Sequence, residues 1–153
     1  QLVNGGKRID PYIVYSNKIS TEIDKNNLAS KRHIKIVRKA LDDATNTTNG
    51  TSYSSRIAGK YKMGGKTGTS QVRVISAKER EDGIIKNKDL PWEMRDHGLF
   101  IGYGPVENPI YSISVIVEHG GSGSGSAAPI ASKIMKYIFK NKINLKKKNL
   151  TNV

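Results

Sequence analysis

One lysine, one glycine and two threonines stand together at Lys66-Thr67-Gly68-Thr69, and their types suit the binding of a carboxylate. The Lys66 ammonium supplies positive charge, and two hydroxyls on an extended segment supply hydrogen bonds to carboxylate oxygens. Gly68 omits a side chain where a ligand would approach the backbone. The alternative is a surface strand whose lysine and threonines only face water. The tripeptide Lys66-Thr67-Gly68 alone is weak evidence for such a site, because this combination arises easily in a chain rich in lysine and glycine.

A phosphate-binding loop is a second interpretation of the same residues. That loop requires a glycine, four further residues and then Gly-Lys-Ser/Thr at the start of a helix. Counting back from Gly65 puts the first glycine at position 60, which is Lys60. The downstream residues 69–75 are rich in β-branched side chains and predict a strand, not a helix. The sequence therefore disfavours a phosphate loop.

Size and composition restrict the class of protein. A chain of 153 residues can bury one core, and it contains no apolar run of about 18 residues that could cross a membrane. It has no cysteine, and His33, His97 and His119 lack the spacing of metal ligands. We expect no metal and no cofactor.

The net charge of +13 raises a second functional hypothesis, a basic module that binds nucleic acid or another polyanion. No aromatic interleaving and no known nucleic-acid module accompanies the charge. A lysine-rich solvated surface is the favoured explanation, so no nucleic acid is expected as a partner. The basic residues gather in a helix and a tail: Lys31, Arg32, Lys35, Arg38, Lys39, Lys140, Lys142, Lys146, Lys147 and Lys148.

The elements around the motif follow from hydrophobic spacing. Glycines at Asn4-Gly5-Gly6 predict a turn before a short extended piece over 9–15. Ser30 is a candidate N-cap for a helix to about Ala44. A strand is expected over about 60–76, followed by an irregular excursion over 77–95.

The C-terminal half predicts a hairpin and a helix. Residues 98–103 and 110–118 should pair antiparallel across a proline-bracketed turn, and the Gly/Ser run 120–126 should connect tightly to the last helix. That helix is expected over about 127–140, with Pro129 in its first turn. Its expected apolar stripe is Ile130, Ile134, Tyr137 and Ile138.

Two further features lie between these elements. Asp96-His97 suggests a hydrolytic dyad, but no Gly-x-Ser-x-Gly nucleophile accompanies it. A structural His97, bonded to a nearby backbone group or carboxylate, is favoured because a triad needs three placed groups. Trp92 could be a partner contact or a local packing residue, and the sequence leaves both open.

The order of these elements resembles the C-terminal part of the transpeptidase domain of penicillin-binding proteins. The third signature of that superfamily is Lys-Thr/Ser-Gly on a strand. Arg95-Asp96-His97 and Glu118-His119-Gly120-Gly121 look most like the elongation-type class B, penicillin-binding protein 2. Further matches are Asn4-Gly5-Gly6 with Pro11, and Gly102-Tyr103-Gly104-Pro105. The resemblance implies an α+β fold, an antiparallel sheet flanked by helices, with 1–140 belonging to the domain and 141–153 forming a basic tail.

The resemblance also implies a function and its residues. Lys66, Thr67, Gly68 and Thr69 would bind an acyl-D-Ala-D-Ala stem peptide of peptidoglycan, or a β-lactam that mimics it. Lys66 and Thr69 would also be catalytic, Lys66 by helping to shuttle a proton and Thr69 by giving its backbone N–H to the oxyanion hole. The parent would be a serine-type D,D-transpeptidase at the periplasmic face of the bacterial inner membrane. Cell-elongation proteins are candidate partners.

The sequence departs from the family in one respect. Neither Ser-x-x-Lys nor Ser-x-Asn occurs in 1–153, so we expect the nucleophile and any membrane anchor upstream of Gln1 and this piece alone to be inactive. A noncatalytic piece that binds cell-wall peptide or a protein is a third hypothesis. We also expect self-association through an apolar sheet face around Leu99, Ile101, Ile113 and Val115.

Overall fold

The computed structural model of the chain describes residues 1–6 and 29–150. The described residues fall into two units, one within 1–40 and one within 41–153. The expected extended piece over 9–15 lies outside the described residues. In the first unit, Gly5 and Gly6 adopt φ of 86° and 87°, which confirms the predicted glycine turn. Helix α1, Lys31–Asn46, crosses the boundary between the units. The Ser30 hydroxyl accepts the His33 N–H at 3.4 Å, as predicted for its N-cap.

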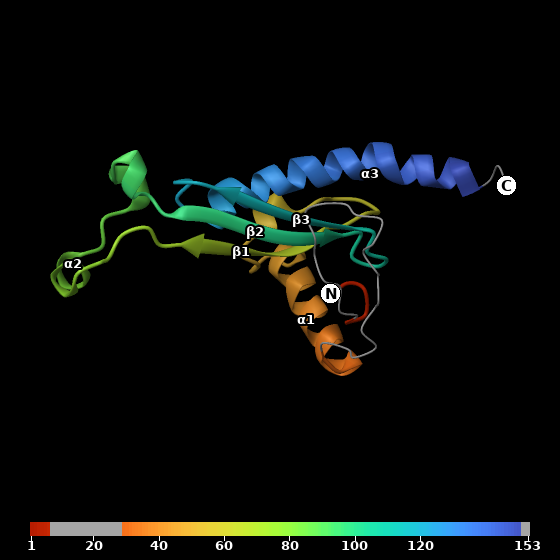
Figure 1. Cartoon of the computed structure of the whole chain (residues 1–153), viewed down its shortest axis with the longest axis horizontal. Coiled ribbons are helices and arrows are strands. Elements are labelled where there is room, and N and C mark those ends of the chain that lie inside the picture. Colours follow the sequence, from red (N-terminus) through yellow and green to blue (C-terminus); the bar gives the residue numbers. More distant parts are fainter. Residues whose placement is uncertain (7–28, 151–153) are drawn as a thin grey trace, which may run out of the picture. The chain divides into compact units, whose positions relative to one another are not determined.

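The second unit is built on a three-stranded antiparallel sheet in the order β1-β2-β3 (Figure 1). Its strands are β1, Gly64–Ser70, β2, His97–Gly104, and β3, Tyr111–Val117. The predicted hairpin of β2 and β3 is confirmed, with Gly102 opposite Ile113. The predicted first strand is shorter than expected, because the chain leaves β2 after Ser70.

The excursion between β1 and β2 contains short helices. They are α2, Ala77–Asp82, and two 3-10 turns, Asn87–Asp89 and Trp92–Met94. The Ser76 hydroxyl caps α2 by accepting the Glu79 N–H at 3.1 Å. None of the residues of these three elements is buried, in line with the irregular segment that the sequence predicted.

The core lies between the sheet and the last helix, α3, Ala128–Leu150. Figure 1 shows α3 running along one side of the sheet. A Cβ added at Gly104 would stand 2.5 Å from the Phe139 ring, so the helix approaches the strand backbone closely. The buried cluster is Ile57, Met63, Phe100, Ala127, Ala128, Ala131, Met135 and Phe139.

The predicted stripe of α3 was wrong for three of its four residues. Ile130, Ile134 and Tyr137 are exposed, and only Ile138 packs against the core. The buried stripe is instead Ala128, Ala131, Met135 and Phe139, which has the same helical spacing but small residues at its start. Small side chains are buried there because the helix begins directly against the glycine-rich strands. The expected tight connection is a turn and a π-helix, Gly123–Ala127, and α3 continues helical past position 140 to Leu150.

The opposite face of the sheet, which we call the open face, carries large apolar side chains in solvent. Ile101 is 55% exposed and Ile116 is 65% exposed. Ile113 and Val115, which the sequence analysis placed on an exposed face, pack instead against the core. The correction follows from the register, in which Val115 lies opposite the fully buried Phe100 and so shares its face. Within 1–6 and 29–150, no helix is long and apolar enough to cross a membrane.

Candidate functional site

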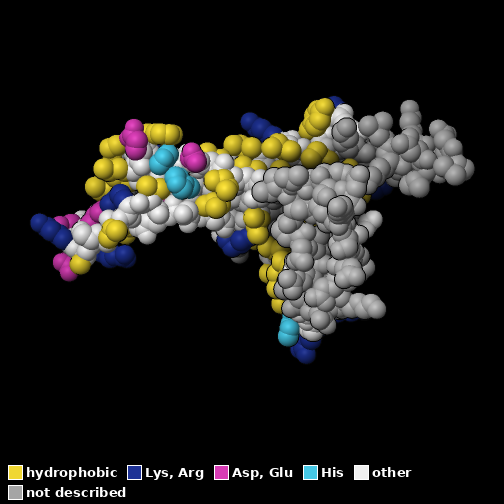
Figure 2. All heavy atoms as spheres, in the orientation of Figure 1, with side chains coloured by type: hydrophobic (Ala, Val, Ile, Leu, Met, Phe, Trp, Pro, Cys, Tyr) yellow, Lys and Arg dark blue, Asp and Glu magenta, His cyan; other side chains and the backbone are white. Residues whose placement is uncertain are grey.

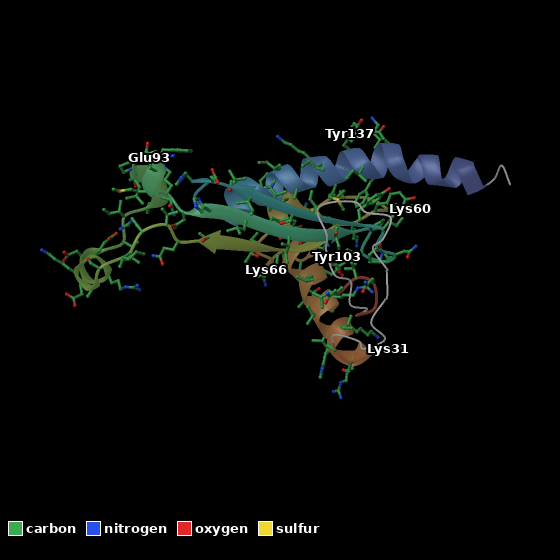
Figure 3. All side chains as sticks on the ribbon, in the orientation of Figure 1. Lys31, Lys60, Lys66, Glu93, Tyr103 and Tyr137 are labelled. Atoms are coloured by element: carbon green, nitrogen blue, oxygen red, sulfur yellow. The ribbon has the colours of Figure 1, made fainter. Side chains whose placement is uncertain are left out.

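The four motif residues lie in the middle and C-terminal half of β1 and divide between its two faces. Side chains alternate along a strand, so Lys66 and Gly68 share the open face with Ile101, while Thr67 and Thr69 project to the other side. Lys66 and Thr69 are exposed. Figure 3 shows Lys66 on β1 on the side of the sheet away from α3. The side chains expected to act together therefore flank the strand instead of sharing one face.

The edge of β1 that is not paired with β2 lies between these two sets of side chains. Backbone groups of an antiparallel strand point alternately to the partner and away from it. The carbonyl of Met63 accepts from Asn46 Nδ2 at 3.0 Å, and that of Gly65 accepts from Thr45 Oγ1 at 3.4 Å, so odd-numbered residues point away from β2. By the same alternation, the Thr69 N–H points to this free edge. A ligand along the edge would meet Lys66, both threonines and that N–H.

The Lys66 ammonium lies against its own strand. Its Nζ donates to the Thr67 carbonyl at 2.7 Å and lies 3.5 Å from Thr67 Oγ1. The Thr67 hydroxyl in turn donates to Thr51 Oγ1 at 3.1 Å. Among the described residues, Lys66 pairs with no carboxylate, so its charge is available to an anionic ligand.

The sequence reasoning missed the residues that hold the N-terminal end of β1. Thr45 and Ser52 are fully buried, and their hydroxyls lie 3.1 Å apart beside the Gly65 carbonyl. Asn46 ties the end of α1 to Met63. The only signal in the sequence was a polar run, Thr45 to Ser55, which resembles an ordinary loop. Burial converts these polar side chains into supports, because a buried hydroxyl needs a partner.

Two glycines of β1 have different reasons to be glycine. A Cβ at Gly65 would stand 2.3 Å from Phe100 Cζ and 2.4 Å from the Ile101 carbonyl oxygen, so packing excludes any side chain there. A Cβ at Gly68 would meet only Leu99 Cβ, at 3.4 Å. Packing within the described residues therefore leaves room at Gly68 on the open face, next to the free edge.

Asp96 and His97 do not form a hydrolytic dyad. The Asp96 carboxylate binds Val72 N–H and Asn87 Nδ2, and His97 Nδ1 accepts the His119 N–H at 2.9 Å. The predicted structural role of His97 is confirmed, with a backbone group as its partner. The Trp92 ring packs at a tilt of 56° against the His119 ring, with centroids 4.4 Å apart, so this half-exposed indole makes a local contact.

A hollow lies beside this group. Its volume is about 320 Å³, and it is lined by Asn87, Lys88, Arg95, His119, Gly120, Gly121 and Ser122. Figure 2 shows imidazoles, in cyan, at the surface beside apolar side chains. Among the described residues, no group of three or more His, Asp or Glu side chains could hold a metal ion.

The excursion also contains a strong ion pair. The Arg73 guanidinium forms two hydrogen bonds to the Glu79 carboxylate, and this contact lowers the pKa of Glu79 from 4.5 to about 2. The same contact raises the pKa of Arg73. The pair ties the chain after β1 to α2.

Comparisons with known proteins agree on one family. The family model described as the penicillin binding protein transpeptidase domain matches residues 1–136. The chain belongs to this family. As a transpeptidase-domain sequence, it is 35% identical over 106 residues to the peptidoglycan D,D-transpeptidase MrdA of Haemophilus influenzae, which covers 69% of this chain and 16% of that protein. Its identity to MrdA of Salmonella typhimurium is 32% over 147 residues, covering 90% of this chain and 23% of the relative.

Solved structures show the same transpeptidase-domain fold. A complex between penicillin-binding protein PBP2 and MreC from Helicobacter pylori matches with a TM-score of 0.70 and 26% identity, covering 93% of this chain and 23% of that one. PBP2 of Pseudomonas aeruginosa in complex with WCK 5153 matches with a TM-score of 0.59 and 27% identity, covering 88% of this chain and 26% of that chain. The predicted family and the α+β fold are thus confirmed. The chain spans about a fifth of the length of these relatives.

Proposed function

We propose that this chain is the C-terminal part of a PBP2-like peptidoglycan D,D-transpeptidase and that β1 is the strand that binds the stem peptide. The observation that carries the proposal is the free edge of β1. Lys66, which pairs with no carboxylate within 1–6 and 29–150, supplies positive charge on one side of that edge, and the threonine hydroxyls lie on the other. An acyl-D-Ala-D-Ala terminus, or a β-lactam, has a carboxylate that fits this arrangement.

The Thr69 N–H has a separate role in the proposal. An acyl transfer passes through a tetrahedral intermediate whose oxygen carries negative charge, and a backbone N–H aimed at that oxygen stabilises it. We assign Thr69 N–H as one donor of the oxyanion hole, because it points to the same edge as the carboxylate-binding groups. Lys66 would also help to move a proton during the acyl transfer. Gly68 keeps the edge accessible.

The nucleophile of this reaction is proposed to lie outside the chain. Among residues 1–153 there is no Ser-x-x-Lys, and acyl transfer needs an activated nucleophile. The acyl-enzyme would therefore form on a serine of the complete protein, with residues 1–140 of this chain forming one wall of its cleft and 141–153 a basic tail. We propose the periplasmic face of the bacterial inner membrane as its location and proteins of the cell-elongation machinery as its partners. A relative, PBP2 of Helicobacter pylori, was solved in complex with MreC.

The proposal is tested by acylation of the complete protein with a fluorescent penicillin. Lys66→Ala should slow acylation about 10- to 100-fold, the value of one charged hydrogen bond. The matched control is Lys62→Ala, since Lys62 is also exposed but precedes β1. The isolated 153-residue chain should remain unlabelled. Equal rates for Lys66→Ala and the unmodified protein would overturn the proposal, as would a stable label on the isolated chain.

The competing hypothesis of a polyanion-binding module rests only on the net charge of +13. A salt titration separates the two, because affinity for DNA that depends on phosphate contacts falls steeply as salt concentration rises. We expect weak binding to DNA without sequence preference, and none near physiological salt.

A further inference from the structure

The start of β2 is linked to the C-terminal end of the site strand. Ser70 lies opposite His97, and Thr69 lies opposite Gly98. Neighbouring strands move together through these backbone pairs. Whatever fixes the start of β2 therefore also fixes the backbone at Thr69, whose N–H points to the free edge.

Asp96 fixes that point by four hydrogen bonds to three segments. Its carboxylate accepts the Val72 N–H at 3.2 Å and Asn87 Nδ2 at 2.9 Å. Its backbone N–H donates to Asn87 Oδ1 at 2.8 Å, and its carbonyl accepts the Gly121 N–H at 2.8 Å. One residue thus ties together the chain after β1, the excursion and the turn after β3.

His97 adds a contact that depends on its protonation state. The His119 backbone N–H can only donate, so His97 Nδ1 must accept with a lone pair, and the imidazole is neutral with its hydrogen on Nε2. His119 itself has a φ of 54°, a left-handed conformation that side chains rarely adopt. Its ring donates from Nδ1 to the Arg95 carbonyl at 3.0 Å, which helps to hold this strained residue.

We infer that Asp96 and His97 are positioning residues that hold the Thr69 end of β1 in place for the substrate, and that this hold requires a neutral His97. The role in substrate binding rests on the proposed function, whereas the hydrogen bonds of Asp96 and His97 do not depend on it. Protonation of His97 Nδ1 would place two donors against each other and break the bond to His119. The turn after β3 would then separate from the start of β2.

Other ionisable groups lie near His97. Its own segment contributes Arg95 and Asp96, and the His119 ring packs against the His97 ring with centroids 4.7 Å apart. Arg73 interacts with Asp96, and Lys88 lines the same hollow as His119.

The hold can be measured on the 153-residue chain by amide hydrogen exchange, without any catalytic activity. Asp96→Ala should lower the protection of the Val72 amide, and His97→Phe that of the His119 amide, each about threefold to tenfold, the value of one hydrogen bond. Both variants should also lower the protection of the Ser70 amide, which lies opposite His97. The Gly64 amide, at the far end of β1, should keep its protection and so report that the sheet has formed. Unchanged protection at Ser70 in both variants would overturn the inference.

His97→Asn is the conservative variant, because the amide oxygen of asparagine can stand where Nδ1 stands and accept the same N–H. Protection of the His119 amide should therefore be retained in His97→Asn and lowered in His97→Phe. Identical behaviour of the Asn and Phe variants would contradict the role of His97. If Asp96→Ala fails to fold, the pair of His97 variants still decides.

The complete protein provides a second measurement. The acylation rate should fall in His97→Phe and be largely retained in His97→Asn, because only asparagine can accept the His119 N–H. Failure of the proposed function would appear as a Lys66→Ala variant with normal acylation. Failure of the positioning role would appear separately, as amide protection that is unchanged by substitution of Asp96 and His97.

Discussion

At the scale of single residues, β1 contains two kinds of glycine. Gly65 is required by packing against Phe100 and the Ile101 backbone, whereas Gly68 meets only Leu99 Cβ at ordinary contact distance. The first belongs to the core and the second to the free edge. The two positions can therefore be tested as a matched pair.

We predict opposite effects for the two alanine variants. Gly65→Ala should destabilise the chain by about 1–3 kcal/mol, because the added methyl group overpacks a filled site. Gly68→Ala should leave the melting temperature nearly unchanged but lower the rate of penicillin acylation in the complete protein. Thermal unfolding and acylation rates provide the two measurements. A Gly68→Ala protein that is strongly unfolded, or fully active, would contradict this assignment.

At the scale of elements, the excursion between β1 and β2 is held by polar contacts instead of burial. None of the residues of α2 or of the two 3-10 turns is buried. Arg73 and Glu79 tie the start of the excursion to α2, and Asn87 binds Asp96, which directly precedes β2. Order in this segment should therefore depend on charge more than the sheet does.

The Glu79 carboxyl gives a prediction for acid pH. Its hydrogen bonds from Arg73 lower its folded pKa to about 2, below the unfolded value of 4.5. The pair therefore stabilises the folded excursion above pH 4.5 and loses that effect as the pH falls toward 2. The titration of the Glu79 carboxyl carbon, followed by NMR, should show the low midpoint. A midpoint near 4.5 would contradict the ion pair, and Glu81→Gln serves as the control for order in α2.

Helix α3 provides a second prediction at this scale. Met135 is fully buried, whereas Ile134, next to it in the sequence, is 43% exposed. Met135→Ala should lower the free energy of unfolding by about 2–5 kcal/mol through the lost packing. Ile134→Ala should change it by about 0.5 kcal/mol or less. Denaturant unfolding of both variants decides between the buried stripe seen here and the stripe that the larger apolar residues would suggest.

At the scale of the whole chain, the open face of the sheet exposes large apolar side chains. Leu99, Ile101 and Ile116 lie on it, and β1 has a free edge beside it. Monomeric proteins rarely leave such apolar faces in contact with water. We therefore expect the isolated chain to self-associate.

Sedimentation over a concentration series should show a species larger than a monomer for the 153-residue chain. A variant carrying Ile101→Thr and Ile116→Thr should shift that equilibrium toward monomer, because both changes remove apolar surface and keep β-branched side chains. Ile110→Thr is the matched control, since Ile110 is 41% exposed but precedes β3. A strictly monomeric chain at every concentration would refute the expectation.

The sequence by itself determined the family and the order of the main helices and strands. The capping serine of α1, the hairpin of β2 and β3 and the motif on β1 are local patterns, and a local pattern needs only its neighbours in the chain. Tertiary structure decided which sides these elements bury. Ile113 and Val115 turned toward α3, and Ala131 and Met135 replaced Ile130 and Ile134 in the core, because register and close backbone approach depend on residues far away in sequence. The contacts of Asp96 and His97 were likewise beyond sequence reasoning, since their partners lie up to 25 residues away along the chain.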